Sequence, residues 1–148
     1  MISVTVANPY EILEPDYARL KLSARTVLEG EGVKEAKISL ALVTDDKIAE
    51  INKRYLDHDG PTDVITFPLS NPKAKKLEGE LVLGVNVAQR EAADRGHDVH
   101  TELCLYVIHG VLHLCGYDDR NAKDTAAMRK KEREYLKKLE LPDIADEE

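Results

Sequence analysis

Residues 98–116 read DVHTELCLYVIHGVLHLCG, and this stretch decides the fold. Its apolar residues fall on nearly every side of a helix, which is typical of a helix packed between other elements rather than lying on the surface. Gly116 is placed to end that helix. We therefore expect a central helix over about residues 98–115, with the other elements arranged around it.

The segments on either side of this helix read as short strands and amphipathic helices. Strands are expected near the N-terminus and at 37–43, 63–67 and 80–85, where apolar and β-branched residues gather. Helices are expected at 15–30, from the capping residue Thr44 to the turn HDGPTD, at 87–95 and at 122–139. This order predicts an α+β fold of the layered α/β type, with a mixed sheet of about four strands covered by about five helices.

Nothing in the sequence divides the chain into parts. Its 148 residues suit one domain, and it contains no repeat, low-complexity tract or Gly/Ser-rich linker. We expect a single domain over residues 1–148 that ends in a loose acidic tail at 143–148.

The sequence favours the cytoplasm. No basic segment precedes the short apolar run at the N-terminus, so this run does not look like a secretory signal. The longest mostly apolar stretch, 103–117, is shorter than the roughly 20 apolar residues that a membrane span needs. Cys104 and Cys115 would lie roughly 16 Å apart on one helix, too far for a disulfide, and unpaired thiols suit a reducing compartment.

The formal net charge of −7 argues against a protein that coats nucleic acid through bulk electrostatics, because phosphate contacts need clustered Lys and Arg. Two local basic clusters are nevertheless present. Taken alone, each is typical of a solvated surface. The clusters are Lys73, Lys75 and Lys76 in an expected loop, and Arg129, Lys130, Lys131 and Arg133 on the last expected helix.

His109 and His113 lie four residues apart on the central helix, so both side chains fall on one face and can reach a single ion. The spacing alone also fits coincidence, or two core histidines bonded to backbone or carboxylate. Two stacked histidines in a buried helix compete for hydrogen-bond partners, however, and a shared metal removes that conflict. A metal site is therefore the favoured interpretation.

The chain then turns at Gly116 and brings Asp118 and Asp119 back toward the end of the helix. Asp119 can complete a set of three ligands with the two histidines. Three protein ligands with one open position are typical of a catalytic site, zinc above all, since the open position holds a water whose pKa the ion lowers. The alternative role for either aspartate is a turn or a helix cap, and Asp118 is the better candidate for a cap.

At this point the sequence resembles a known family. HGVLHLCGYDD at 109–119 is similar to the signature of the bacterial YbeY family, metal-dependent endoribonucleases that mature ribosomal RNA. NKRYLDHDGPTDVITFP at 52–68 resembles the second signature of the family. GELVLG, EAADRG and the spacing to Met128 and Glu132 also match, so that the resemblance covers most of residues 40–135.

The resemblance implies a single-strand-specific endoribonuclease that takes part in ribosomal RNA maturation and ribosome quality control, with single-stranded RNA and the ribosome as partners. It implies one zinc ion on His109, His113 and Asp119, with manganese or nickel as alternatives. A water activated by the metal would carry the chemistry, and no side chain is assigned as the base. By the same resemblance, Asn52, Tyr55, Thr62 and Asp63 line the substrate cleft. Without it, Tyr55 also fits core packing, and Thr62 and Asp63 also fit a polar turn that enters a strand.

Two positions depart from the family pattern. The family usually has a histidine where this chain has Asp119, and an arginine where it has Leu56. The charge of Asp119 offsets part of the charge of the ion, which should make the bound water less acidic, and its hard oxygen favours a wider choice of metals. Leu56 removes a natural clamp for phosphate, and Arg54 does not share its helix face, so turnover is expected to be lower than in relatives that keep the arginine.

Two other classes of function remain open. Zinc peptidases carry the same pair of histidines, but place their general base, a glutamate, where this chain has Gly110. A ribosome-associated binding protein with a structural metal is the third possibility, and Leu56 and Asp119 keep it open.

Overall fold

The computed structural model describes residues 1–145 and shows four strands and five helices in this part of the chain. The strands are β1 (Ile2–Ala7), β2 (Glu35–Val43), β3 (Val64–Pro68) and β4 (Lys76–Gly84). The helices are α1 (Tyr17–Gly30), α2 (Asp45–Leu56), α3 (Val85–Arg95), α4 (Val99–Leu114) and α5 (Ala122–Lys138). The expected α+β architecture is confirmed.

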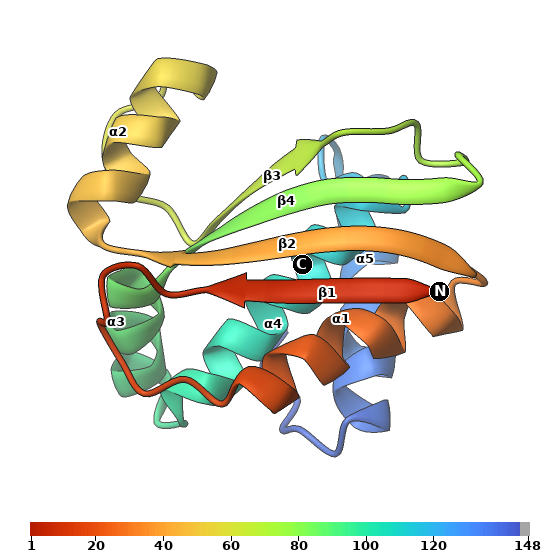
Figure 1. The fold of residues 1–148 in the computed structure, drawn as a ribbon. Coiled ribbons are helices and arrows are strands. Elements are labelled where there is room, and N and C mark those ends of the chain that lie inside the picture. The colour runs from red at the N-terminus through yellow and green to blue at the C-terminus, as the bar shows by residue number, and fades with distance from the viewer. Residues whose placement is uncertain (146–148) are drawn as a thin grey trace.

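The strands form one mixed sheet in the order β1-β2-β4-β3. β1, β2 and β4 run parallel, with Val4 opposite Ile38 and Leu40 opposite Leu81. β3 runs antiparallel to β4 and lies at the edge of the sheet. The parallel pairs need crossover connections, which α1 and α2 are part of, whereas β3 joins β4 through a short loop (Figure 1).

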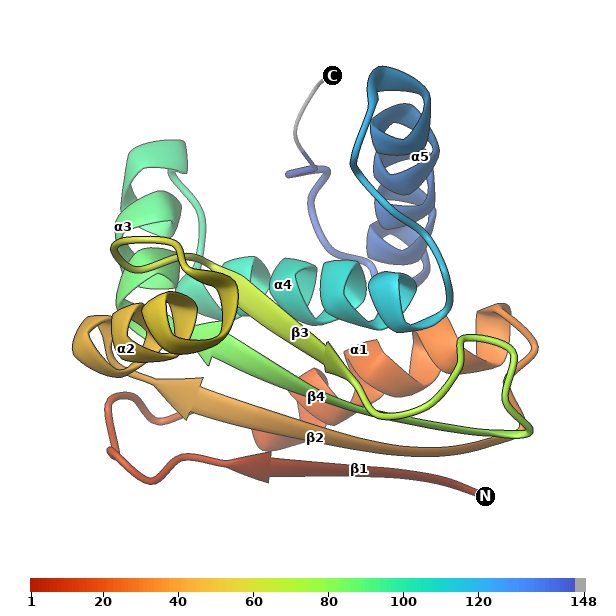
Figure 2. The same cartoon turned by 90° about the horizontal axis from the view of Figure 1, so that it is seen from above.

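The sheet has two unequally covered faces, because successive side chains of a strand point to opposite sides. One face of β2 and β4 joins the main core, to which α1, α4 and α5 contribute. The other face carries a smaller cluster under α2, formed by Val43, Ile48, Ile65 and Val82. Figure 2 shows α1 and α4 beside the strands and α5 packed on them from farther out.

The central helix predicted from its apolar residues is α4. It is buried on nearly all sides, from Thr101 to Leu114, with the two histidines half-buried. Asp98 caps its start by accepting a hydrogen bond from the backbone N–H of His100. After its end, Gly116 adopts a φ of 107°, a left-handed conformation that glycine adopts without strain and that turns the chain back along the helix.

β4 differs most from its predicted bounds, since it begins at Lys76 rather than at residue 80. The polar residues at its start conceal an inward pattern, because Leu77 is buried and Gly79 lies against the side chain of Leu114. A Cβ on Gly79 would meet Leu114 Cδ2 at 2.5 Å, so a glycine within a strand marks a close approach of the helix. The strand expected at 63–67 is β3, which extends one residue further to Pro68, as an edge strand permits.

The C-terminal segment differs from the loose tail expected at 143–148. Ile144 and Ala145 are buried, and Arg95 donates a hydrogen bond to the carbonyl oxygen of Ile144. The apolar residues of the segment explain this, because they cover the end of the main core. Residues 146–148 lie outside the described part of the chain. Within residues 1–145, no helix combines the length and the apolar character that a membrane crossing requires.

Candidate metal centre

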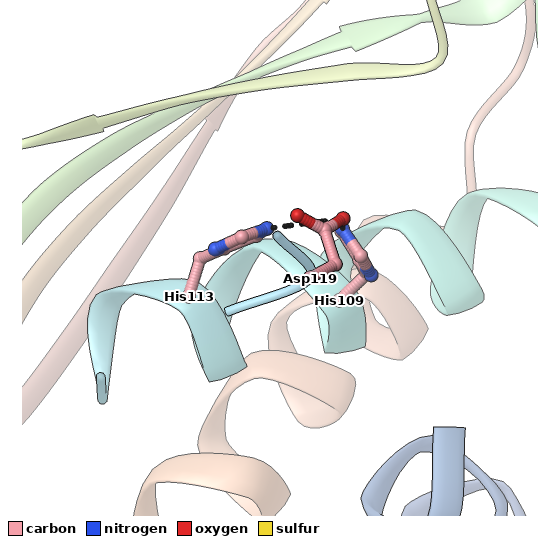
Figure 3. A group of neighbouring side chains, drawn as sticks. All are labelled: His109, His113 and Asp119. Atoms are coloured by element: carbon pink, nitrogen blue, oxygen red, sulfur yellow. Dashed lines mark ion pairs between the residues drawn. The ribbon is translucent and has the colours of Figure 1, made fainter. Parts of the chain in front are cut away.

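Two elements bring three potential metal ligands together. His109 and His113 project from the same face of α4, one turn apart. Asp119 comes from the connection between α4 and α5, which Gly116 turns back and which the backbone N–H of Tyr117 ties to Leu112. Figure 3 shows the carboxylate of Asp119 meeting the two imidazole rings above the helix.

The ligand atoms of these three residues all lie within 4.8 Å of one another. Asp119 Oδ2 is 3.7 Å from His109 Nε2 and 3.8 Å from His113 Nε2. The two rings are 4.8 Å apart between centroids and nearly perpendicular, at 79°. Within residues 1–145 this is the one group of three or more His, Cys, Asp or Glu side chains arranged in this way.

The donor set suits a zinc-type cation. Zinc binds His nitrogen and carboxylate oxygen at about 2.0–2.2 Å, which places tetrahedral ligands about 3.3–3.5 Å from one another. The two measured distances to Asp119 exceed that separation by only a few tenths of an ångström. Asp119 is more exposed than either histidine, so the side that is not occupied by protein faces solvent. The arrangement can therefore hold an ion and leave a coordination position open.

A buried glutamate of α5 binds the ring nitrogen of His109 that faces away from Asp119. Glu132 is 1% exposed, and its Oε2 accepts a hydrogen bond from His109 Nδ1 at 2.6 Å. The same carboxylate accepts hydrogen bonds from Arg129 at 2.8 and 3.0 Å, which balances its buried charge. In the neutral tautomer that donates this bond through Nδ1, Nε2 presents its lone pair toward Asp119.

His113 is kept neutral by its surroundings. Burial, and then the neighbouring His109, lower the pKa of His113 below its ordinary value, although Asp119 acts in the opposite direction. Its imidazole is therefore unprotonated at neutral pH, which is the form that binds a metal.

The aspartate expected to cap the last helix does not do so. Asn121 is the N-cap of α5, where its side chain accepts from the backbone N–H of Asp124. Asp118 instead accepts from the backbone N–H of Asp119 at 2.8 Å and pairs with Arg120. The prediction of Asp118 as the cap was wrong because α5 begins three residues later, and the role of Asp118 is to shape the turn that presents Asp119.

The three residues line a cleft of about 400 Å³ between α4 and the edge strand β3. Asp63, the residue before β3, lines this cleft, and its carboxylate accepts a hydrogen bond from the backbone N–H of Val64. Thr62 lines the adjoining cavity of about 340 Å³, which also contains Asp63 and His109. Leu56, at the end of α2, forms part of the cleft wall. The full lining of the cleft is Leu56, Asp63, Val64, Ile65, Thr66, Pro68, His109, His113, Asp119 and Arg129.

The other two residues expected to contact substrate lie elsewhere. Asn52 is buried, and its amide donates to the carbonyl oxygen of Gly60 at 3.0 Å, which holds the loop between α2 and β3. Tyr55 is 58% exposed and packs edge-on against Phe67, with ring centroids 5.6 Å apart. It lines a separate groove with Phe67 rather than the cleft of the histidines.

Gly110 faces the sheet. A Cβ at this position would lie 2.4 Å from Leu81 Cδ2, so the helix approaches β4 too closely for a side chain. A glutamate at position 110 would meet Leu81 of β4, and position 110 is not among the residues that line the cleft.

In the sequence, Glu132 stands out by its spacing in the family pattern and Arg129 as part of a basic cluster, but neither is assigned a role in the site. A physical signal was available, because Glu132 follows Met128 by four residues and precedes Leu136 by four, which places it on the buried face of α5. A carboxylate on such a face is almost always paired. Its partner could not be read from the sequence, since His109 lies 23 residues away on another helix.

Comparison with known proteins identifies the family of the chain. A family model described as Endoribonuclease YbeY matches residues 9–140. A protein named Endoribonuclease YbeY from Pelotomaculum thermopropionicum is 37% identical over 129 residues, covering 82% of this chain and 85% of that protein. One of the same name from Syntrophus aciditrophicus is 34% identical over 141 residues, covering 91% and 88%.

The fold has a solved counterpart. The solution structure of TM1509 from Thermotoga maritima superposes with a TM-score of 0.66 at 28% identity, covering 94% of this chain and 89% of that one. With both long sequence motifs placed around one cleft, and with a family model that matches most of its length, the chain belongs to the YbeY family of endoribonucleases.

Proposed function

We propose that this endoribonuclease cleaves single-stranded RNA, ribosomal RNA in particular, at one divalent cation held by His109, His113 and Asp119. The observation that carries the proposal is the convergence of these three ligand atoms within 4.8 Å at the wall of a cleft. When bound, the cation supplies Lewis-acid polarisation of the phosphoryl group and a water of lowered pKa. We favour zinc, with manganese or nickel as alternatives because of the oxygen ligand.

The contribution of the protein to this mechanism is to hold the metal ligands in position. Glu132 fixes the ring of His109 through Nδ1, and burial keeps His113 neutral, so that both imidazoles present a lone pair toward the cation. Asp119 adds a negative charge on a solvent-facing side chain, which is 40% exposed. A bound water should therefore be less acidic than at a site with three neutral ligands, which would move the rise of activity with pH to higher pH.

The cleft supports a single-stranded substrate. Its volume, about 400 Å³, is that of a pocket for a small molecule and suits a nucleotide or two of an extended strand. Thr62 and Asp63 at the start of β3 would contact the strand, whereas Asn52 would act by holding the loop that carries them. Tyr55 offers a base a stacking surface outside the cleft.

The setting of this activity is proposed to be the cytoplasm, with the ribosome as partner, in ribosomal RNA maturation and ribosome quality control. A net charge of −7 limits indiscriminate binding to nucleic acid, so that RNA contacts would be local. Lys73 and Lys75 are exposed on the loop between β3 and β4 and line a different cavity from that of the metal ligands, so a contact between them and RNA would lie outside the cleft.

A peptidase is the weaker alternative, because the position that would carry its general base is Gly110, which faces Leu81. A binding protein with a structural metal is the other alternative. It is less favoured because the third ligand is an exposed aspartate at an open cleft, whereas structural zinc sites are closed by four protein ligands.

The test is cleavage of single-stranded ribosomal RNA by protein loaded with zinc or manganese, with the metal content measured by elemental analysis. We expect His113→Ala to lower the cleavage rate by more than about 100-fold, because it removes a direct ligand. His100→Ala is the matched control, since this histidine lies on the same helix outside the cleft. Wild-type protein that cleaves no better than His113→Ala would reject the proposal.

A further inference from the structure

The cleft of the candidate metal ligands is also lined by Arg129, to which no function has been assigned so far. Among the residues that line the cleft in the described part of the chain, Arg129 is the one Lys or Arg side chain. It comes from α5 and lines the cleft together with residues of β3. Its side chain is 16% exposed, so most of it is held within the protein while its edge reaches the cleft.

Arg129 is connected to the metal centre through a single carboxylate oxygen. Glu132 Oε2 accepts from Arg129 Nη1 at 2.8 Å and from His109 Nδ1 at 2.6 Å. Glu132 Oε1 accepts from the same Arg129 nitrogen at 3.0 Å. The position of the guanidinium is thus fixed relative to His109, and the guanidinium has further electrostatic partners as well.

A positive side chain in the cleft would reduce the repulsion that an entering RNA phosphate meets there. Asp63 and Asp119 both line the cleft and carry negative charge, and the phosphate adds another. The planar fork of arginine matches two phosphate oxygens, and its charge persists at every relevant pH. Leu56, on the wall formed by α2, offers neither a charge nor a hydrogen bond.

Arg129 also lies where two cavities meet. It lines the cleft of the metal ligands and the adjoining cavity of about 340 Å³, to which Arg95 also contributes. Asp63, His109 and Arg129 line both cavities, so a strand that occupied both would lie against Arg129. This location distinguishes Arg129 from the other basic residues of α5. Lys130 is exposed, and Lys131 pairs with Glu31 and Glu134.

We propose that Arg129 binds a backbone phosphate of the RNA at the metal centre and so supplies, from α5, the positive charge that Leu56 does not supply from α2. The contact is a hydrogen-bonded ion pair to non-bridging oxygens, in which Arg129 keeps its protons throughout. The proposal rests on the proposed endoribonuclease function and adds a substrate-binding residue to it.

The first experiment removes the positive charge of Arg129 on α5 and introduces a positive charge at position 56 on α2. We expect Arg129→Ala to lower kcat/KM for RNA by about 100- to 1,000-fold, the usual effect of removing one group that stabilises the charge of the transition state. Arg129→Lys should lose less, because it keeps the charge and the pairing with Glu132 but not the fork. Leu56→Arg should restore at least about tenfold in the Arg129→Ala background, and should raise cleavage by a smaller factor in the wild type.

Lys130→Ala is the matched control, since it removes a positive charge one residue away on an exposed side chain and should leave cleavage unchanged. Zinc affinity is measured for every variant. Loss of cleavage by Arg129→Ala in parallel with loss of zinc would overturn the proposal, because Arg129 would then act only through Glu132. Failure of Leu56→Arg to restore any activity while zinc stays bound would count against it as well.

The second experiment separates this contact from catalysis. Binding of a single-stranded oligonucleotide is measured against salt concentration in metal-free protein, where no cleavage occurs. We expect Arg129→Ala to reduce the slope of log affinity against log salt by about 0.7, the value for one phosphate contact on a single strand, and Lys130→Ala to leave it unchanged. An unchanged slope for Arg129→Ala rejects the proposed contact. A reduced slope in a protein that never cleaves RNA supports the contact and rejects the proposed endoribonuclease mechanism.

Discussion

Two buried carboxylates of this protein have nearly the same surroundings but different roles. Glu102 is 2% exposed and binds one histidine and one arginine, with His97 Nε2 at 2.5 Å and Arg95 Nη1 at 3.5 Å. Glu132 is 1% exposed and also binds one histidine and one arginine, His109 and Arg129. Both carboxylates line the same cavity beside the candidate metal centre.

The difference lies on the far side of each histidine. His109 meets His113 from the same helix and Asp119 from the following turn, whereas His97 belongs to no group of three potential ligands within residues 1–145. A glutamate that holds a histidine is therefore not enough to indicate a metal centre. The pair of His97 and Glu102 ties the connection after α3 to α4, whereas the pair of His109 and Glu132 holds a ring whose other nitrogen lies near two further potential ligands.

The largest expected effect tests the two histidines directly. His109→Ala should weaken zinc binding by more than about 100-fold, because it removes a ligand, and His97→Ala should leave zinc affinity and the one-to-one stoichiometry unchanged. Titration of metal-free protein with zinc, followed by calorimetry, measures both. Equal losses in the two variants would mean that the two pairs are not functionally different.

The two glutamates give the next largest effect. Glu132→Gln should weaken zinc binding by about 10- to 100-fold, because the amide supports His109 less well than a carboxylate does. Glu102→Gln should change zinc affinity less than about twofold, although both substitutions disturb a buried ion pair and should cost similar unfolding free energy, about 1–3 kcal/mol. Zinc affinity is compared with urea unfolding for each variant, and a zinc defect in Glu102→Gln would remove the distinction.

The smallest expected effect concerns how the unfolding free energy of metal-free protein depends on pH. Burial lowers the pKa of His113 in the folded protein, so below about pH 6.5 the unfolded chain takes up a proton that the folded chain resists. The stability of metal-free protein should therefore be unaffected by this group above that pH, and should fall as the pH drops from 6.5 toward the lower folded pKa. Urea unfolding between pH 7.5 and 5 measures the change, and His113→Gln should flatten this part of the profile.

Much of the fold follows from local patterns because those patterns record burial. The all-round apolar surface of 98–115 indicated a central helix, and α4 is buried on nearly every side. The beginning of β4 was missed because its outward residues are charged and its inward position 79 is a glycine, which gives no hydrophobic signal although it packs under Leu114. Ile144 and Ala145 were missed for a related reason, since a short acidic segment contains too few apolar residues to show a period.

The candidate site was accessible from the sequence only as far as it is local. His109, His113 and Asp119 lie within eleven residues, so helix geometry and one turn place them together. The partners from α5 and the residues from β3 depend on how helices and strands pack across the cleft, which no spacing encodes. The N-cap of α5 was predicted wrongly because several residues that can cap a helix occur close together between 118 and 124.

The connection that carries Asp119 joins α4 to α5, and it has a consequence for how the protein opens. One ion bound to α4 and to this connection would fasten together two helices that otherwise meet through side-chain packing and the bond between His109 and Glu132. Zinc should then slow amide hydrogen exchange at the start of α5 more than in the sheet, because ligand binding stabilises most the parts that must separate to release it. The ion would then hold α5 to α4 in addition to its part in the reaction.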